Sequence, residues 1–242
     1  MNNISFYGRT DVGLVRPNNE DALLADSQAK FCLVADGMGG AAAGETASQI
    51  FVQTTGEIFN KQLVTSGEDA MERVQKSFIN ANNRILEHVQ AFPQHQGMGC
   101  TAEILAFWEN TFVIGHIGDS RTYRLRGHHL KQMTRDHSLV QDQIDQGLLT
   151  FAQARSHSMR NVILRAVGVR PALEVDTLRG PVTAGDLFML CSDGLTDMVE
   201  DQVIASVLAL EASMPEKVEQ LVTLAKQAGG KDNITVLLAL VT

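Results

Sequence analysis

The sequence predicts an α+β fold in which two antiparallel β-sheets pack together and a helix pair covers each outer face, giving a four-layer αββα sandwich. Strand-like segments follow one another in hairpin-linked runs, and helical periodicity comes in two paired blocks. A parallel sheet would instead need strands and helices to alternate. Because no linker, low-complexity tract or internal repeat is visible, residues 1–242 are expected to form a single domain.

Four blocks carry apolar residues at helical spacing. They cover residues 42–59 and 66–91 as one pair, and residues 199–210 and 215–228 as the other. Ser66 stands where an N-cap is expected. Pro215 suits the first turn of a helix because its missing N–H is not needed there. We therefore expect two pairs of long helices.

Most of the remaining chain is strand-like. Residues 100–134 hold apolar runs separated by the turn-like dipeptides EN and RG, as in a meander of hairpins. Residues 186–193 and 233–242 are short and strongly apolar, which predicts buried strands. Residues 136–169 are different, because they are polar, with short helical stretches and no clear strand. We expect this segment to be a flap insertion over the surface of the sheets that contributes to substrate binding.

The composition restricts the class of partner. A formal net charge of -8 argues against nucleic acid or an anionic membrane as the main partner. Neither a signal peptide nor a membrane-spanning apolar run is visible, and the three cysteines are widely spaced in apolar runs, as reduced core residues would be. We therefore expect a cytoplasmic protein that is a monomer.

A glycine-rich turn follows the strand-like segment FCLVAD. Gly37, Gly39 and Ala42 match the pattern of a dinucleotide-binding turn. Asp36, however, stands directly before the first glycine, where it would repel a pyrophosphate. The second strand ending in an acid that such a fold requires is also missing from the sequence that follows. The turn therefore predicts a metal site instead of a phosphate cradle.

Four aspartates share this local setting, because each stands at the end of a strand-like segment with glycine close by. They are Asp36, Asp119, Asp193 and Asp232. If these strand ends converge, the carboxylates cannot all stay ionised without positive charge among them, and oxygen ligands favour Mg²⁺ or Mn²⁺. Taken singly, each aspartate is better explained as a turn residue, so the prediction depends on the four together.

Seven short motifs occur in order along the chain. They are RPNNED (16–21), DGMGG (36–40), GCTA (99–102), GDSR (118–121), RDHS (135–138), SDGLTD (192–197) and DNIT (232–235). The set resembles the metal-dependent protein serine/threonine phosphatases of type 2C, in their short bacterial form, over nearly the whole chain. The likeness extends to cyanobacterial members that act on the nitrogen-signalling protein PII, which makes PII a candidate substrate.

The resemblance implies a central β-sandwich flanked by helices, with a metal centre at one edge that holds two Mg²⁺ or Mn²⁺ ions. By motif matching, Asp36 bridges the two ions, and Asp193 and Asp232 complete one of them. Glu20 and the carbonyl group of Gly37 complete the other ion.

Four more positions gain roles from the same resemblance. Asp119, together with Asp193, matches the position of a third, weaker metal ion. Asp21 and Asn233 support the ligands from behind. Arg16 aligns with the arginine that binds the substrate phosphate, and a guanidinium group can contact two phosphate oxygens at once.

In such a site, water held between two metal ions attacks the phosphorus of phosphoserine or phosphothreonine in line. One position departs from the pattern. Met38 stands where eukaryotic members carry a histidine proposed to protonate the leaving oxygen, and a thioether cannot donate a proton. Water on the third ion and His157 of the flap remain as alternative donors.

The sequence therefore predicts a signalling phosphatase that acts on phosphoserine and phosphothreonine in proteins. Two alternatives stay open: a non-catalytic regulatory domain of the same fold, and a hydrolase of small phosphate esters or of nucleic acid. Regulatory domains of this kind typically lose metal-site acids, whereas this chain keeps them. The acidic charge disfavours a polynucleotide substrate.

Overall fold

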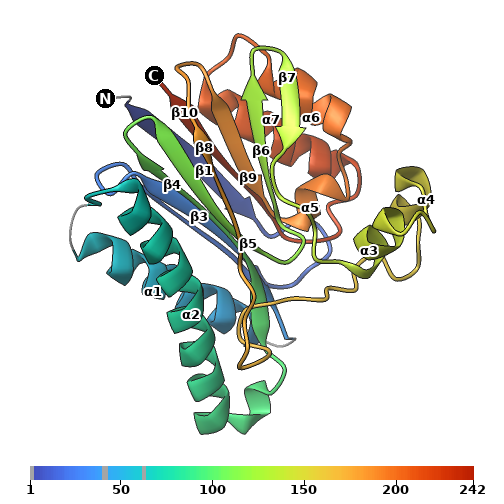
Figure 1. The fold of residues 1–242 in the computed structure, drawn as a ribbon. Coiled ribbons are helices and arrows are strands. Elements are labelled where there is room, and N and C mark those ends of the chain that lie inside the picture. Colours follow the sequence, from blue (N-terminus) through green and yellow to red (C-terminus); the bar gives the residue numbers. More distant parts are fainter. Residues whose placement is uncertain (1–2, 40–42, 62–63) are drawn as a thin grey trace.

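The computed structural model describes residues 3–39, 43–61 and 64–242, and it contains two five-stranded antiparallel sheets (Figure 1). The first sheet has the order β1 (Ile4–Asp11), β10 (Ile234–Val241), β9 (Leu187–Cys191), β6 (Arg121–Arg126) and β7 (His129–Gln132). The second has the order β2 (Asp21–Asp26), β3 (Phe31–Met38), β4 (Gly99–Trp108), β5 (Thr111–Ile117) and β8 (Asp176–Pro181).

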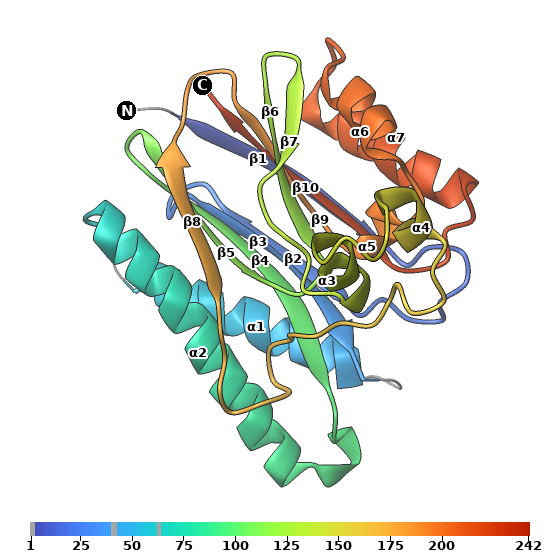
Figure 2. The same cartoon turned by 45° about the vertical axis from the view of Figure 1, so that its right-hand side comes forward.

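A helix pair covers the outer face of each sheet, as Figures 1 and 2 show. Helices α1 (Ala43–Asn60) and α2 (Gly67–Ala91) lie on the second sheet, and α6 (Asp201–Leu208) and α7 (Met214–Gln227) lie on the first. Short elements complete the chain: η1 (Pro93–His95), α3 (Leu139–Asp145), α4 (Phe151–Arg155) and α5 (Asp193–Thr196). The predicted four-layer αββα sandwich is confirmed.

Three hydrophobic clusters hold the four layers together. One lies between α1, α2 and the second sheet, another between the first sheet, α6 and α7, and the third between the two sheets. In the third cluster the ring of Phe188 packs 5.7 Å from that of Phe107 and 5.2 Å from that of Phe112, measured between centroids. Each fully buried phenylalanine stabilises the fold by about 1.5–3 kcal/mol, so the sheets are fixed firmly against each other.

The helix ends largely follow the sequence signals. Ser66 is the N-cap of α2 and accepts a hydrogen bond from the Asp69 N–H at 3.0 Å. Pro215 lies in the first turn of α7, as predicted. The block at residues 199–210 gives a shorter helix, because the buried Val199 belongs to the turn that leaves α5.

The strand predictions were correct in kind, with two corrections. Residues 100–134 do not form one meander, because the β4–β5 hairpin belongs to the second sheet and the β6–β7 hairpin to the first. The edge strand β8 was missed, since nearly all of its residues face solvent and it carries no apolar signature. Residues 136–169 contain α3 and α4 and project beside the sandwich as a lobe (Figure 1). We call residues 136–169 the flap.

Two further findings concern the sequence expectations. Cys32, Cys100 and Cys191 are buried, free thiols. Within the described part of the chain, no helix is both long and apolar enough to cross a membrane. Ala42, the last position of the dinucleotide-like pattern, lies outside the described residues, as does Gly40 of the DGMGG motif.

Candidate metal and phosphate site

The strand-end aspartates come from both sheets and face one another. Asp36 lies near the end of β3, and Asp119 lies in the turn that follows β5. Asp193 is the first residue of α5, and Asp232 stands shortly before β10. The pKa of Asp36 is raised well above its usual value, first by burial and then by the charges of the neighbouring aspartates. The pKa of Asp193 is raised for the same reasons. We call Asp21, Asp36, Asp119, Asp193 and Asp232 the carboxylate cluster.

Within this cluster, Asp21 connects the two sheets. It pairs with Asp36 across the β2–β3 ladder, and its Oδ2 atom accepts hydrogen bonds from Ser192 Oγ at 2.7 Å and Thr235 Oγ1 at 2.6 Å. Its other oxygen, Oδ1, is buried without a hydrogen-bond partner. Burial, only partly offset by the two hydroxyl groups, raises the pKa of Asp21 to about 6. Asp21 is therefore held by residues in and directly after strands of the first sheet, and its support of metal ligands stays a prediction.

Asn233 holds the loop that carries Glu20. Its Oδ1 atom accepts a hydrogen bond from the Glu20 N–H at 2.8 Å, and its Nδ2 group donates to the carbonyl groups of Val12 at 3.0 Å and Asn18 at 2.9 Å. The Glu20 carboxylate lies against the first turn of α1. A Cβ atom added at Gly44 would come 2.4 Å from Glu20 Oε2, so only glycine fits there. Asn233 thus fixes the backbone of this candidate ligand.

Arg16 lies at the exposed edge of the cluster. Its Nη2 group donates to Asp232 Oδ2 at 2.7 Å, and about half of its side chain is exposed. Hydrogen bonding to Asp232 and the charges of Asp232, Glu20 and Asp193 raise the pKa of Arg16. A guanidinium group in this place stays charged and can reach an anion that enters from solvent.

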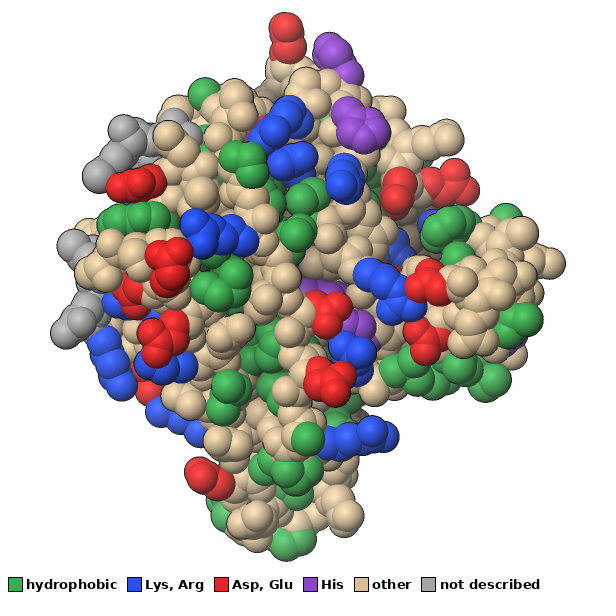
Figure 3. All heavy atoms as spheres, in the orientation of Figure 1, with side chains coloured by type: hydrophobic (Ala, Val, Ile, Leu, Met, Phe, Trp, Pro, Cys, Tyr) green, Lys and Arg blue, Asp and Glu red, His purple; other side chains and the backbone are tan. Residues whose placement is uncertain are grey.

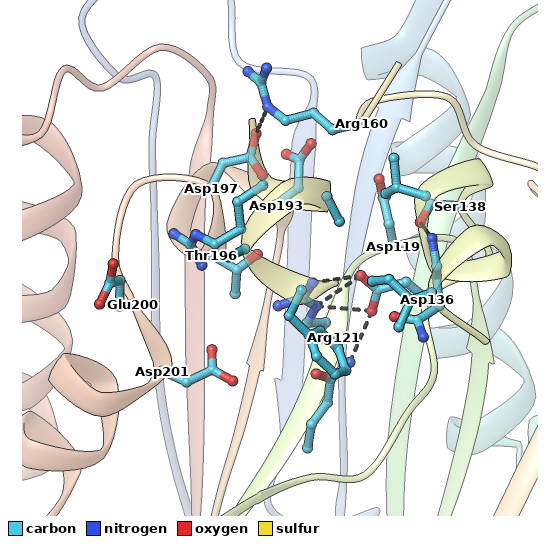
Figure 4. Close-up of a pocket in the computed structure, with 18 of the residues that line it drawn as sticks. Asp119, Arg121, Asp136, Ser138, Arg160, Asp193, Thr196, Asp197, Glu200 and Asp201 are labelled. Carbon is cyan, nitrogen blue, oxygen red and sulfur yellow. Dashed lines mark hydrogen bonds and ion pairs between the residues drawn. The ribbon is translucent and has the colours of Figure 1, made fainter. Parts of the chain in front are cut away.

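The turn at Gly118 presents Asp119 to a cavity of about 560 Å³ between α5, α6 and the flap (Figure 4). Gly118 has φ +111, and a Cβ atom there would come 2.4 Å from Thr101 Cβ, so the turn requires glycine. Asp119 and Asp193 both line the cavity, and Asp119 Oδ1 has no hydrogen-bond partner. Burial first, and then the charge of Asp136, raises the pKa of Asp119 to about 7.

The donor set fits hydrated divalent cations. In residues 3–39, 43–61 and 64–242, no group of three or more His, Cys, Asp or Glu side chains is arranged to hold a metal ion by itself. Mg²⁺ does not need such a cage, since it keeps several waters and is usually bound through one or two carboxylates. The unpartnered oxygens of Asp21 and Asp119, together with the mutual repulsion of the aspartates, indicate that the cluster lacks positive charge. The grouping of ligands around individual ions stays a prediction.

Comparison with known proteins places this site in a family. Residues 16–237 match the family model described as protein phosphatase 2C, and this range contains all the candidate site residues. The chain belongs to the protein phosphatase 2C family. The resemblance drawn from the seven motifs is therefore confirmed.

Similar proteins of this family include named phosphatases. The chain is 38% identical over 239 residues to "Serine/threonine protein phosphatase PstP" of Mycobacterium tuberculosis, which covers 98% of this chain but only 45% of that relative. It is 36% identical over 234 residues to "Serine/threonine phosphatase stp" of Listeria monocytogenes, covering 95% of this chain and 93% of that relative. A solved structure of the PstP catalytic domain with two manganese ions has a TM-score of 0.90 at 36% identity, covering 99% of this chain and 98% of that one.

At Met38 this phosphatase 2C chain departs from the eukaryotic members, which carry a histidine at that position. Met38 ends β3 and is half-buried, and no proton donor replaces the missing histidine at that position. The alternative donor His157 forms a local contact, because its Nδ1 atom accepts a hydrogen bond from the Met159 N–H at 3.2 Å. Its contacts within the described part of the chain are local, so its role as the acid stays a prediction.

Sequence reasoning missed two side chains of this phosphatase 2C site. Ser192 and Thr235 fix Asp21 across the two sheets. Both belong to the motifs SDGLTD and DNIT, whose acids are the candidate ligands. A hydroxyl group directly beside a predicted ligand was the available signal.

Proposed function

We propose that this chain hydrolyses phosphoserine and phosphothreonine in proteins with the help of divalent cations. The observation that carries the proposal is the carboxylate cluster with Arg16 at its exposed edge, in a chain of the protein phosphatase 2C family. The names of the similar proteins support a protein substrate, and the two manganese ions of the PstP catalytic domain support the metal requirement.

Each part of the site contributes to this reaction. Two cations bound at the cluster would offset phosphate charge and lower the pKa of a water that attacks phosphorus in line. Arg16 binds the phosphate oxygens and stabilises the negative charge that they carry in the transition state. The guanidinium group of Arg16 is hydrogen-bonded to Asp232. An incoming phosphate therefore either replaces Asp232 as its partner or binds the guanidinium group alongside Asp232. Asp21, Asn233 and the hydroxyl groups around them hold the ligands in place.

The proposal assigns the ligands as the family pattern does. Asp36 would hold both ions, Asp193 and Asp232 would complete the first, and Glu20 with the Gly37 carbonyl would complete the second. Asp119 and Asp193 would hold a third, weaker ion. Either Mg²⁺ or Mn²⁺ suits these oxygen donors.

The finer parts of the proposal concern the cellular role. We infer a single catalytic domain over residues 1–242, in a cytoplasmic monomer, with the flap contributing to substrate binding and PII as a candidate substrate. On the face shown in Figure 3, Lys and Arg side chains are interspersed with Asp and Glu, which agrees with a protein partner and not with nucleic acid.

Phosphate release from a phosphothreonine peptide tests the proposal. We expect turnover with Mn²⁺, none after complete chelation, and a loss on the order of 100-fold or more in Asp193→Ala. Glu211→Ala, which removes an exposed acid from the loop after α6, is the matched control and should retain full activity. Turnover that survives chelation would refute the metal requirement. Hydrolysis of p-nitrophenyl phosphate without any peptide turnover would favour the small-ester alternative, and neither reaction would favour the regulatory domain.

A further inference from the structure

A second group of buried ionisable side chains lies beside the flap and takes no part in the site described above. Glu103 on β4 and His116 on β5 are almost completely buried, and His116 Nδ1 contacts Glu103 Oε1. Thr122 on β6, in the other sheet, donates its hydroxyl hydrogen to Glu103 Oε2. Glu103 therefore connects three strands of the two sheets.

Glu103 and His116 share one proton. The Nδ1 atom of His116 faces Glu103, and its Nε2 atom lies 2.8 Å from the carbonyl oxygen of Arg135. With the Glu103 carboxylate ionised, both partners are acceptors, so each ring nitrogen carries a proton. Burial raises the pKa of Glu103 and works to lower that of His116, but the charges of Glu103 and Asp136 and the two hydrogen bonds raise the pKa of His116 overall. We assign the shared proton to His116, which is then an imidazolium ion that balances Glu103.

The ring of His137, which lies in the flap, packs against His116 with centroids 4.5 Å apart. Its Nδ1 atom accepts a hydrogen bond from the Gly118 N–H at 3.1 Å, so its single proton is on Nε2, 3.2 Å from Asp176 Oδ2. Burial and the neighbouring His116 charge lower the pKa of His137 to about 4. A neutral ring therefore packs on a charged one.

His137 also joins both ends of the flap to the turn that presents Asp119. Its N–H group donates to the Gly118 carbonyl at 2.7 Å, and its own carbonyl accepts from the Leu164 N–H at 2.7 Å. Together with the bond from Gly118 to the ring, the entering and leaving segments of the flap meet on one residue. His137 is in turn hydrogen-bonded to Gly118, which directly precedes Asp119.

We propose that Glu103, His116 and His137, here called the histidine clamp, are positioning residues that hold the flap in one orientation relative to the Asp119 turn and the phosphoprotein-binding face. A buried ion pair is a poor source of stability compared with apolar packing, so its value here is geometric. The effect of the clamp on substrate binding rests on the proposed phosphatase function, whereas the role of the clamp in holding the flap does not.

Two substitutions of Glu103 separate geometry from charge. In Glu103→Gln, the amide can donate to Nδ1 of a neutral His116 and accept from Thr122, while Nε2–H still bonds to the Arg135 carbonyl, so every contact is kept. In Glu103→Leu, the volume is similar but Thr122 and His116 Nδ1 lose their partner. The positioning role thus predicts that Gln restores what Leu destroys.

Hydrogen exchange of the flap amides gives a readout that does not depend on activity. In Glu103→Leu we expect the amides of His137, Leu139 and Leu164 to exchange about tenfold faster or more, with Leu238 in β10 unchanged. KM for a phosphopeptide should rise about tenfold, while kcat/KM for p-nitrophenyl phosphate, which has no peptide chain for the flap to bind, stays within about twofold. Glu103→Gln should behave as the wild type in all three measurements.

Unchanged exchange at these amides, or equally faster exchange at Leu238, would overturn the proposal, as would equal losses on both substrates. If Glu103→Leu fails to fold, Asp176→Ala decides the question, because from a half-exposed position it removes the carboxylate that pairs with His137 Nε2 and with Arg165 of the flap. Faster exchange at the three flap amides then supports the clamp, and wild-type exchange refutes it. A wild-type chain without phosphopeptide activity would refute the proposed function, and the exchange data would still decide the attachment.

Discussion

Two groups of ionisable side chains, each with a member at or just after the end of β5, differ in how their charge is balanced. The carboxylate cluster gathers five aspartates, and burial together with the charges of other members raises the pKa of Asp21, Asp36 and Asp193, with Arg16 paired at the edge. The histidine clamp sets one carboxylate against one imidazolium, and each polar contact has a partner. An unbalanced group needs charge from outside the chain, whereas a balanced one serves the structure alone. The contrast separates a ligand site from a structural network without any knowledge of the family.

The largest expected effect comes from neutralising one member of the unbalanced cluster. Asp36→Asn should lower phosphopeptide turnover with Mn²⁺ by about 100-fold or more, because the site loses a ligand. The chelated variant should nevertheless be more stable than the chelated wild type by about 1 kcal/mol, since a crowded charge is removed. For a chain of this size that is about 2–4 °C in Tm. A lower Tm in the variant would show that the aspartates do not repel one another.

Binding of cations should give the next largest effect. At a free Mn²⁺ concentration of about 100 times Kd, the folded state gains about 2.7 kcal/mol, or roughly 5–10 °C in Tm. Thermal unfolding with and without Mn²⁺ measures this gain. Glu103→Gln should retain it in full because the clamp is already balanced, and Asp36→Asn should lose most of it. An equal gain in Tm in both variants would mean that Mn²⁺ binds outside the carboxylate cluster.

The sequence allowed the carboxylate cluster to be predicted because each acid carries a local signal. Asp36, Asp193 and Asp232 stand at the ends of apolar strands beside glycines, and a strand end with a glycine can be recognised from neighbouring residues alone. The layers of the sandwich were predictable for a similar reason, since apolar periodicity is a local property. Convergence of the strand ends was a hypothesis, which the mutual charge effects now support.

The Glu103–His116 pair of the histidine clamp could not be predicted in this way. Glu103 and His116 are thirteen positions apart, in strands where each looks like one polar residue in an apolar run. Their contact depends on the register of β4 with β5, in which they are direct partners, and a shift of one residue would place the two side chains on opposite faces of the sheet. Strand β8 was missed for a related reason, since its solvent-facing edge has no pattern that distinguishes it from a loop.

The last prediction uses pH to separate the two rings of the clamp. The pKa of His137 is lowered to about 4 in the folded chain, against about 6.5 in the unfolded chain. As pH falls from about 6.5 towards 4, the unfolded state takes up a proton that the folded state refuses, so the wild type loses stability.

His137→Gln can keep the bonds to Gly118 and Asp176 without titrating. The free energy of unfolding of wild type relative to this variant should therefore fall by about 1–3 kcal/mol across that window and stay constant above it. Urea unfolding of the chelated proteins at several pH values measures the difference. Because carboxylate titrations outside the clamp occur in both proteins, they cancel, and the remaining slope belongs to His137. A difference that does not change with pH would mean that His137 has the same pKa in the folded and the unfolded chain, so that no charge on His116 acts on it.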